Sequence, residues 1–302
     1  MTDLDRLIHA FYATATETGW ADFRSRALQM LCEVLGMHAA AWLTASASQA
    51  PGEFCQYPES AGLSSRQLAS LRSKLHAREQ VYRPLCPELS STPAAAETGY
   101  VFHYAHRGGA LSSLILLRRP QDAAGPERTD DWQRAIGHMV EAGSLALNQF
   151  VLRDEWLEAL GRPSRGAAAL MDASATLYAA SPRFRDILTA EFQLPEDFQR
   201  LPLTLPPAVI GNGGNLDLGS LRCRVTRHGN LYQVHVRPPA ALDMLSRREQ
   251  QIACALGTGK TFKGVAREHG LAVSTVANHV SRIYKKLGIY RREELMQLLR
   301  KS

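Results

Sequence analysis

Hydrophobic residues are spaced most regularly in the stretch from 245 to 302, where the pattern predicts four short helices. Ser246 and Glu249 have the three-residue spacing of a capping box, in which each side chain binds a free amide at a helix start. Glycines at 257, 270 and 288 end the first three helices. One continuous buried face of the third helix is predicted by residues at steps of four, three and four: Val276, Val280, Ile283 and Leu287.

Two short helices joined by a tight turn, the second with small polar residues on its outer face, are typical of a helix-turn-helix. Charge supports a DNA-binding role for this stretch. Residues 245–302 hold 12 Lys and Arg against 4 Asp and Glu, a charge of +8, while the whole chain carries only +6. Such a local basic excess favours contact with phosphates. The alternative is a small helical domain whose basic residues are merely solvated.

The same stretch resembles the C-terminal domain of LuxR-type (GerE-type) bacterial transcription regulators. The resemblance covers about a fifth of the chain and implies a four-helix DNA-binding domain. Two positions depart from the family pattern, Gly264 in place of the usual Glu and Ala277 in place of a charged residue. The matching residues are Leu245, Ser246, Arg248, Glu249, Gly259, Lys263, Val265, Ala266, Ser274, Thr275, Val276, His279, Ile283, Lys286, Leu287, Gly288, Arg292, Glu294 and Leu295.

DNA contacts are predicted on the outward face of the third helix and at its ends. The expected base-facing positions are Ala277, Asn278, Ser281 and Arg282. Among them Asn278 is the best base reader, because an amide can bond an adenine edge through two atoms, and Ala277 offers a contact to a thymine methyl. Phosphate contacts, which position the protein without reading sequence, are expected from Lys263, Thr275, Lys285 and Lys286.

Upstream, residues 1–160 read as helices flanking a mostly antiparallel sheet. Helices are predicted from Leu4 to Phe11 and from Phe23 to Leu35, and later from Leu63 to Leu75 and from Asp130 to about Leu160. Strands are predicted at 37–43, 53–57, 100–106 and 110–117, the last two joined as a hairpin by Arg107-Gly108-Gly109. This order resembles a GAF sensory domain.

Residues 161–240 form a second block that resembles the opening and closing parts of a PAS domain. Strands at 167–171 and 176–180 flank the turn Asp172-Ala173-Ser174, and a helix runs from 181 to 188. A hairpin over 221–237 turns at His228-Gly229-Asn230. The stretch of this chain that would correspond to the helix-rich middle of a PAS domain is short, so we interpret the block as a truncated PAS domain. Pro238-Pro239-Ala240 suits a stiff linker, and we expect an α+β multidomain protein divided at 1–160, 161–240 and 241–302.

Composition narrows the function further. At 302 residues, with 45% hydrophobic and 21% charged residues, the chain is expected to be globular and cytoplasmic, because it has neither a long apolar run nor a signal peptide. The five cysteines form no C-x-x-C pair, so no metal site is expected. No cofactor is expected, and because no nucleophile with a base and no carboxylate pair emerges, neither is an enzyme.

Aromatic residues of the first domain are the candidates for binding a small organic effector. In the hairpin, Phe102 and Tyr104 lie on one strand face and His103 on the other. We expect a pocket near Trp42, Tyr57, Phe102 and Tyr104, with His103 as a polar contact. The alternative is that these aromatics fill the core, as aromatic side chains commonly do.

These patterns favour a sensory transcription regulator that binds double-stranded DNA, with an upstream region that responds to a small effector. In the alternative, the upstream domains serve only dimerisation or protein interaction. A homodimer is expected in either case, through the last helix (Arg292 to Lys301, with Leu295, Leu298 and Leu299) or through the long helix from Asp130. RNA polymerase is a candidate partner, and no membrane association is expected.

Overall fold

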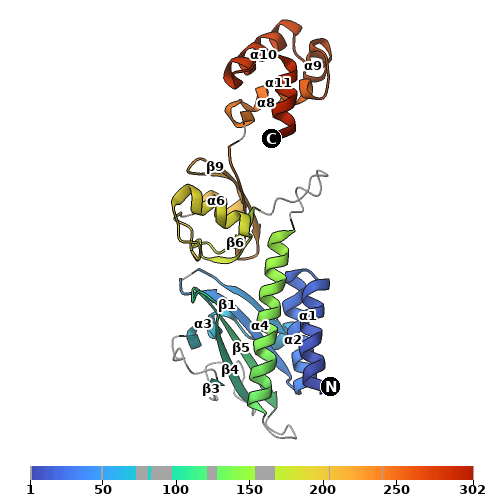
Figure 1. The fold of residues 1–302 in the computed structure, drawn as a ribbon. Coiled ribbons are helices and arrows are strands. Elements are labelled where there is room, and N and C mark those ends of the chain that lie inside the picture. Colours follow the sequence, from blue (N-terminus) through green and yellow to red (C-terminus); the bar gives the residue numbers. More distant parts are fainter. Residues whose placement is uncertain are drawn as a thin grey trace. The chain divides into compact units, whose positions relative to one another are not determined.

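Contacts in the computed structural model divide the chain into two compact units, Met1–Arg237 and Pro238–Ser302 (Figure 1). The structure describes residues 2–48, 50–72, 81–82, 97–120, 128–153, 167–203, 205–239 and 241–301. Two predicted helix ends lie outside these ranges: the end of the helix from Leu63 beyond residue 72 and the end of the long helix beyond residue 153. The boundary predicted at 160 also lies outside, and the division of the upstream region into two domains stays a proposal.

The first part of unit Met1–Arg237 is a five-stranded antiparallel sheet with helices on both faces. Its strand order is β2-β1-β5-β4-β3. The predicted helices and strands of this part are present, and β3 was not predicted. The elements are α1 (Asp3–Glu17), α2 (Trp20–Leu35), β1 (Ala39–Ser46), β2 (Glu53–Tyr57), α3 (Ser65–Arg72), β3 (Val81–Tyr82), β4 (Glu97–Ala105), β5 (Leu111–Pro120) and α4 (Thr129–Leu152).

Alternation along the strands gives this sheet two apolar faces. Phe102 and its neighbours in register pack against α1, α2 and α4, whereas Val101 faces the opposite side, where α3 packs (Figure 1). The predicted hairpin is confirmed, with Ala105 paired to Ser112 in the register of β4 and β5. Both faces of the sheet are therefore buried.

The second part of the unit is another five-stranded antiparallel sheet, with the order β7-β6-β10-β9-β8. Numbered within each sheet, both follow the order second, first, fifth, fourth, third. The predicted opening strands and closing hairpin are confirmed, whereas α7 and β8 were not predicted. The elements are β6 (Ala168–Met171), β7 (Leu177–Ala180), α6 (Pro182–Phe192), α7 (Pro207–Asn212), β8 (Gly214–Leu218), β9 (Leu221–His228) and β10 (Leu231–Arg237).

Helix α4 belongs to the cores of both sheets. Trp132, Ile136 and Met139 bury against the first sheet and the helices beside it. The same hydrophobic cluster continues into the second sheet through Leu170 and Leu231, and α4 contacts β6 and β7. The two sheets therefore share one continuous core along this helix.

A buried carboxylate connects the two sheets as well. Asp172, which has no exposed surface, follows β6 and accepts a hydrogen bond from Ser46 Oγ at the end of β1 (2.7 Å). It also accepts from the amides of Ser174 (2.9 Å) and Thr176 (3.1 Å) and from Ser174 Oγ (2.6 Å). Four donors thus converge on one side chain, which fixes the β6–β7 turn against the first sheet.

Further hydrogen bonds join the two sheets. Tyr178 Oη in β7 donates to the Thr44 carbonyl in β1 (3.3 Å). Asn230 Nδ2, in the turn between β9 and β10, donates to the Gly52 carbonyl (3.0 Å). The predicted turn residue Asn230 therefore has a tertiary role in addition to its local one.

Unit Pro238–Ser302 contains the four predicted helices in order: α8 (Arg247–Gly257), α9 (Phe262–His269), α10 (Val273–Leu287) and α11 (Arg292–Lys301). Both hydrogen bonds of the predicted capping box at Ser246 and Glu249 are present. Gly270 and Gly288 end α9 and α10 in the left-handed conformation, as predicted. The fold class is thus α+β, with two antiparallel sheets upstream and four helices at the C-terminus.

The Asp172 network makes a testable prediction about stability. Replacing Asp172 with Ala leaves four donors without their acceptor, two of them on the buried residues Ser46 and Thr176, which should lower the free energy of unfolding by about 3 kcal/mol. Urea unfolding followed by tryptophan fluorescence measures this loss. The control is Asp217→Ala, which removes an exposed surface pair with Arg222 and should cost less than about 1 kcal/mol. Equal losses in the two variants would contradict the assigned role of Asp172.

Candidate DNA-binding surface and upstream cavity

Helix α10 separates sharply into a buried and an exposed face. Val276, Val280 and Ile283 are buried in the core of unit Pro238–Ser302. Four residues of the predicted outer face are exposed: Asn278, Ser281, Arg282 and Lys285. The helix therefore presents an amide, a hydroxyl and two cations to solvent, which are the groups that read base edges and bind phosphates.

The start of α10 differs from the starts of the two helices before it. Ser246 caps α8 and Thr261 caps α9, each by accepting a hydrogen bond from a backbone amide. The N-cap of α10 is Ala272, and no side chain caps this end. The first amides of α10 are therefore left to bind an external acceptor, and a phosphate oxygen is the acceptor that a helix start favours.

The remaining predicted DNA contacts have more varied surroundings. Lys263 is exposed in the first turn of α9 and has no ion pair among the described residues. Thr275 and Ala277 are half-buried. Lys286 is exposed in α10, but its ammonium binds the Glu249 carboxylate (2.7 Å). Lys286 thus has a partner inside the domain, which sequence reasoning did not foresee.

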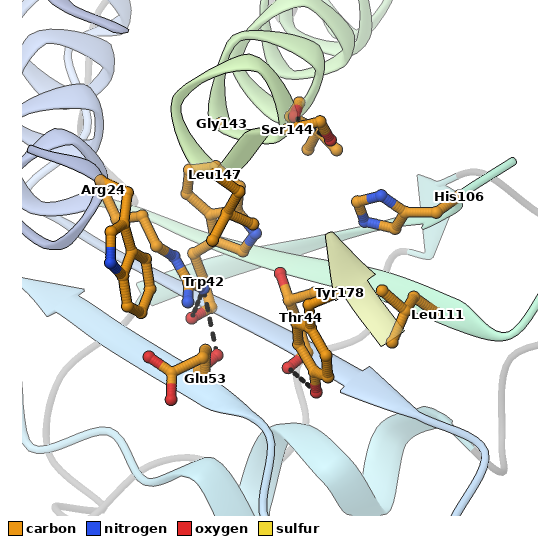
Figure 2. A pocket seen from close by; sticks show the side chains of 12 residues that line it. Arg24, Trp42, Thr44, Glu53, His106, Leu111, Gly143, Ser144, Leu147 and Tyr178 are labelled. Carbon is orange, nitrogen blue, oxygen red and sulfur yellow. Dashed lines mark hydrogen bonds between the residues drawn. The ribbon is translucent and has the colours of Figure 1, made fainter. Parts of the chain in front are cut away.

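A small cavity lies in unit Met1–Arg237 between the first sheet, α4 and β7 (Figure 2). Its volume is about 20 Å³, room for about one water molecule. Apolar walls come from Trp20, Trp42, Leu111, Val140 and Leu147. Polar side chains in the lining are Arg24, Thr44, Glu53, His106, Ser144 and Tyr178.

One of the five predicted effector contacts, Trp42, lines this cavity, and the other four do not. Phe102 is fully buried in the core, and Tyr57 packs against its edge. Tyr104 Oη donates to the Gln133 carbonyl of α4. His103 lies on the opposite strand face from Phe102, so the five residues do not surround a common space. A ligand contact by these four stays a prediction.

Arg24 is one of the lining residues that sequence reasoning missed. It is 7% exposed, and its Nη2 donates to the carbonyls of Trp42 (3.0 Å) and Glu53 (3.1 Å). A signal was present, because Arg24 stands at helical spacing with Ala27 and Leu31 on the apolar face of α2, where a charge is unusual.

Burial also changes the acidity of two groups that line the cavity. It raises the pKa of the Glu53 carboxyl, although the nearby Arg24 opposes this change. It lowers the pKa of His106, whose Nε2 lies 2.8 Å from Ser113 Oγ. The neutral forms of both side chains are therefore favoured relative to water.

Comparison with known protein families matches residues 243–299 to the bacterial regulatory proteins of the luxR family. The C-terminal domain is a LuxR-type DNA-binding domain. The match covers about a fifth of the chain, so the chain carries a C-terminal domain of this regulatory family. A comparison with curated proteins found no match.

Solved structures resemble the chain only distantly. SdiA in complex with octanoyl-rac-glycerol aligns with 99% of this chain and 95% of its own at 9% identity and a TM-score of 0.35. Escherichia coli SdiA in a further crystal form aligns with 96% and 94% at 10% identity and 0.33. The GAF domain of a Coxiella burnetii phosphoenolpyruvate-protein phosphotransferase aligns with 53% and 96% at 14% identity and 0.35. TM-scores of this size do not support a functional conclusion.

The described residues were also searched for membrane and metal-binding features. None of their helices is long and apolar enough to cross a membrane. Among the same residues, no group of three or more His, Cys, Asp or Glu side chains is arranged to hold a metal ion.

In the LuxR-type domain, Glu249 joins the start of α8 to the end of α10. Only 4% of the residue is exposed, and its carboxylate accepts from Lys286 Nζ (2.7 Å) and from the Ser246 amide (2.7 Å). These hydrogen bonds lower the pKa of Glu249 to about 2, and the bond from Lys286 has the largest effect. The ion pair therefore holds α10 against α8 at neutral pH.

Gly264, a departure from the family pattern, has no packing reason to be glycine. A Cβ at this position would meet only ordinary van der Waals neighbours, Thr261 Oγ1 at 3.5 Å and Lys260 Cβ at 3.8 Å. Because a glycine inside a helix is flexible in the unfolded chain, Gly264 should lower the stability of α9 by about 0.5–1 kcal/mol relative to Ala. Gly257 differs, because a Cβ there would collide with the Leu299 side chain.

The Glu249–Lys286 pair predicts a pH dependence of stability. Because the pKa of Glu249 falls from 4.5 to about 2 on folding, its stabilisation is complete above pH 4.5 and is lost as the pH falls toward 2. Calorimetric melting of the full chain across this window should show the loss in the transition of unit Pro238–Ser302. Glu249→Gln keeps a capping side chain but cannot titrate, so its melting temperature should fall less with pH. Identical pH profiles would refute the assignment.

Proposed function

We propose that the protein is a sequence-specific transcription regulator in which α10 reads bases and unit Met1–Arg237 responds to a small organic effector. The observation that carries the first half is the exposed polar face of α10 opposite the buried Val276, Val280 and Ile283. The experiment that tests the whole is a measurement of DNA affinity with and without candidate effectors.

Base reading is assigned to the centre of the exposed face. Asn278 supplies an amide that donates and accepts at once, which suits an adenine edge. Ser281 and Arg282 lie one turn further along α10, and half-buried Ala277 offers a methyl group beside them. The family's charged residue is absent at Ala277, so we expect this domain to prefer a different base there.

Phosphate contacts are assigned to the two ends of this surface. Lys263 and Lys285 are exposed cations, and Thr275 lies in the uncapped first turn of α10. Lys286 is assigned mainly to holding α10 in place within the domain, because its ammonium binds the Glu249 carboxylate. These residues would set the register of α10 on the duplex without choosing a sequence.

The effector response is supported by the cavity that contacts both sheets of the unit. Its present volume is far below the roughly 300–1,000 Å³ of pockets for drug-sized ligands, so a very small ligand is implied unless side chains move. The alternative function, dimerisation alone, is favoured by two exposed leucines on α4, Leu145 (37% exposed) and Leu152 (49%). A change in DNA affinity on addition of an effector would favour effector sensing over dimerisation alone.

A homodimer remains part of the proposal, with α4 as the preferred interface. The other candidate helix, α11, has no leucine among the exposed large hydrophobic residues. Leu295 is fully buried, and Leu298 and Leu299 pack against the core of the same domain. Sedimentation should give a dimer at micromolar concentration that weakens when Leu145 and Leu152 become Ser. A monomer both free and on DNA would refute this assembly.

The first prediction for DNA binding concerns specificity. Asn278→Ala should remove about 1–3 kcal/mol of discrimination at one or two base pairs. Selection of bound sequences from a random duplex library, followed by sequencing, measures the preference at each position. Ser281→Ala in the neighbouring turn serves as a comparison, since a lone hydroxyl discriminates bases less. If the selected sites of Asn278→Ala match those of the unchanged protein, Asn278 does not read a base.

The second prediction concerns affinity alone. Lys263→Ala should weaken binding to all sequences alike and lower the slope of log affinity against log salt by about 0.9 for the lost phosphate contact. Fluorescence anisotropy at several salt concentrations measures the slope. Asn278→Ala, which changes no charge, should leave it unaltered. A slope unaffected by Lys263→Ala would make this residue a surface charge only.

A further inference from the structure

The first residue of α10 is a valine that the domain does not use for its own packing. Val273 is 44% exposed, whereas Val276, Val280 and Ile283 of the same helix are buried in the core. Among the residues of α10, all of which the structure describes, Val273 is the only large apolar residue that is exposed. The stability of the fold therefore does not explain an apolar side chain at this position.

The chemistry of this helix start also differs from what stabilises a helix. Hydroxyl or amide side chains at the N-cap and carboxylates in the first turn favour a helix start. Here the N-cap is Ala272, and the first turn contains no acidic residue. Valine adds little, because its branched Cβ restricts the side chain in a helix. The start of α10 is therefore apolar and free of acidic side chains, so it can approach a phosphate backbone without repulsion.

Val273 lies beside the proposed base-reading face of α10. Residues four apart adjoin on one side of a helix, so Val273 adjoins Ala277 in the next turn. Ala277 is half-buried, and Asn278 and Ser281 are exposed next to it. The helix thus presents an apolar edge, formed by Val273 and Ala277, next to the amide and hydroxyl groups of its polar face.

Double-stranded DNA is the partner that fits an apolar edge at this place. A helix-turn-helix inserts the N-terminal part of its second helix into the major groove, where these residues contact base edges. The basic excess of residues 245–302, 12 Lys and Arg against 4 Asp and Glu, complements the charge of the duplex. The apolar group that the base pairs present in the major groove is the C5 methyl of thymine.

We propose that Val273 contacts the C5 methyl group of one thymine in the DNA sequence that the protein binds, with Ala277 completing the apolar edge. This inference rests on the base-reading half of the proposed function and adds a residue and a chemical group to it. The uncapped amides at the same helix start would bind a neighbouring phosphate. Recognition by the methyl group also implies that 5-methylcytosine, which carries the same group at C5, replaces this thymine better than cytosine does.

The test uses the full-length protein and a duplex enriched from a random library. Each thymine is replaced in turn by deoxyuridine, which removes the C5 methyl and keeps every hydrogen-bonding group of the base. At one thymine the affinity, measured by fluorescence anisotropy, should fall about fourfold, as expected for one buried methyl group. In Val273→Ala the same replacement should change the affinity by less than about twofold, because the contact is already lost.

A matched control is available in the other unit. Val34→Ala makes the same change at a valine that is also 44% exposed, on α2, and should keep the fourfold response to deoxyuridine. Val273→Ala should melt at the same temperature as the unchanged protein, because an exposed valine contributes little to packing. The two variants therefore separate the contact with DNA from any effect on folding.

Three results would overturn the proposal. The first is an enriched duplex in which no thymine responds to loss of its methyl group. The second is a thymine that responds equally in Val273→Ala and in the unchanged protein, and the third is equal affinity for cytosine and 5-methylcytosine at the responsive position. Each of them leaves base reading by the rest of α10 in place. A library from which no sequence is enriched would instead refute the base-reading half of the proposed function, and this inference with it.

Discussion

The close approach of α4 to Trp42 at Gly143 is the contact on which the upstream unit depends. A Cβ at Gly143 would lie 2.6 Å from Trp42 Cη2 and 3.4 Å from the Phe23 ring, so only glycine lets the helix reach this depth. Trp42 is held from the other sides as well, since its Nε1 donates to Ser113 Oγ (3.2 Å) and Arg24 covers its face. A helix displaced outward here would open the core that both sheets share.

The same contact explains why a charge is tolerated on the buried face of α2. Once the indole plane is fixed, it offers the Arg24 guanidinium an electron-rich surface, and the adjacent strand carbonyls offer acceptors. These interactions offset part of the cost of removing the cation from water. One glycine in α4 thus determines, through one ring, where the buried cation of the unit lies.

Local patterns predicted most of the elements, because each depends on neighbours in sequence. The capping box at Ser246, the left-handed Gly270 and the Gly-Gly hairpin before Leu111 are of this kind. Elements that depend on distant contacts were missed, such as the two-residue strand β3, which exists only by pairing with Phe102 and Val101. Strand alternation in β4 was also predicted, but it cannot tell a core face from a pocket face.

The candidate sites differ in the same way, because some depend on local patterns and others on distant contacts. The outward face of α10 could be predicted, because helical periodicity alone separates Asn278 from Val280. The ion pair of Lys286 could not, since Glu249 lies 37 residues away in sequence. The cavity was largely missed for the same reason. Its lining combines α2, β1, β2, β5, α4 and β7. Of these residues Trp42 was predicted, and the signal at Arg24, a charge in an apolar stripe, was missed.

A shared core has a consequence for how this protein can be rearranged by recombination. The face of the second sheet that carries Leu170 and Leu231 is covered by the same cluster that covers Phe102. A chimera joined between residues 153 and 167 would bring together surfaces that never evolved to meet, and both halves would expose apolar area to water. A junction at Pro238-Pro239 follows the division between compact units and leaves each core whole. New pairings of an upstream unit with a different DNA reader are therefore physically easiest at the proline pair.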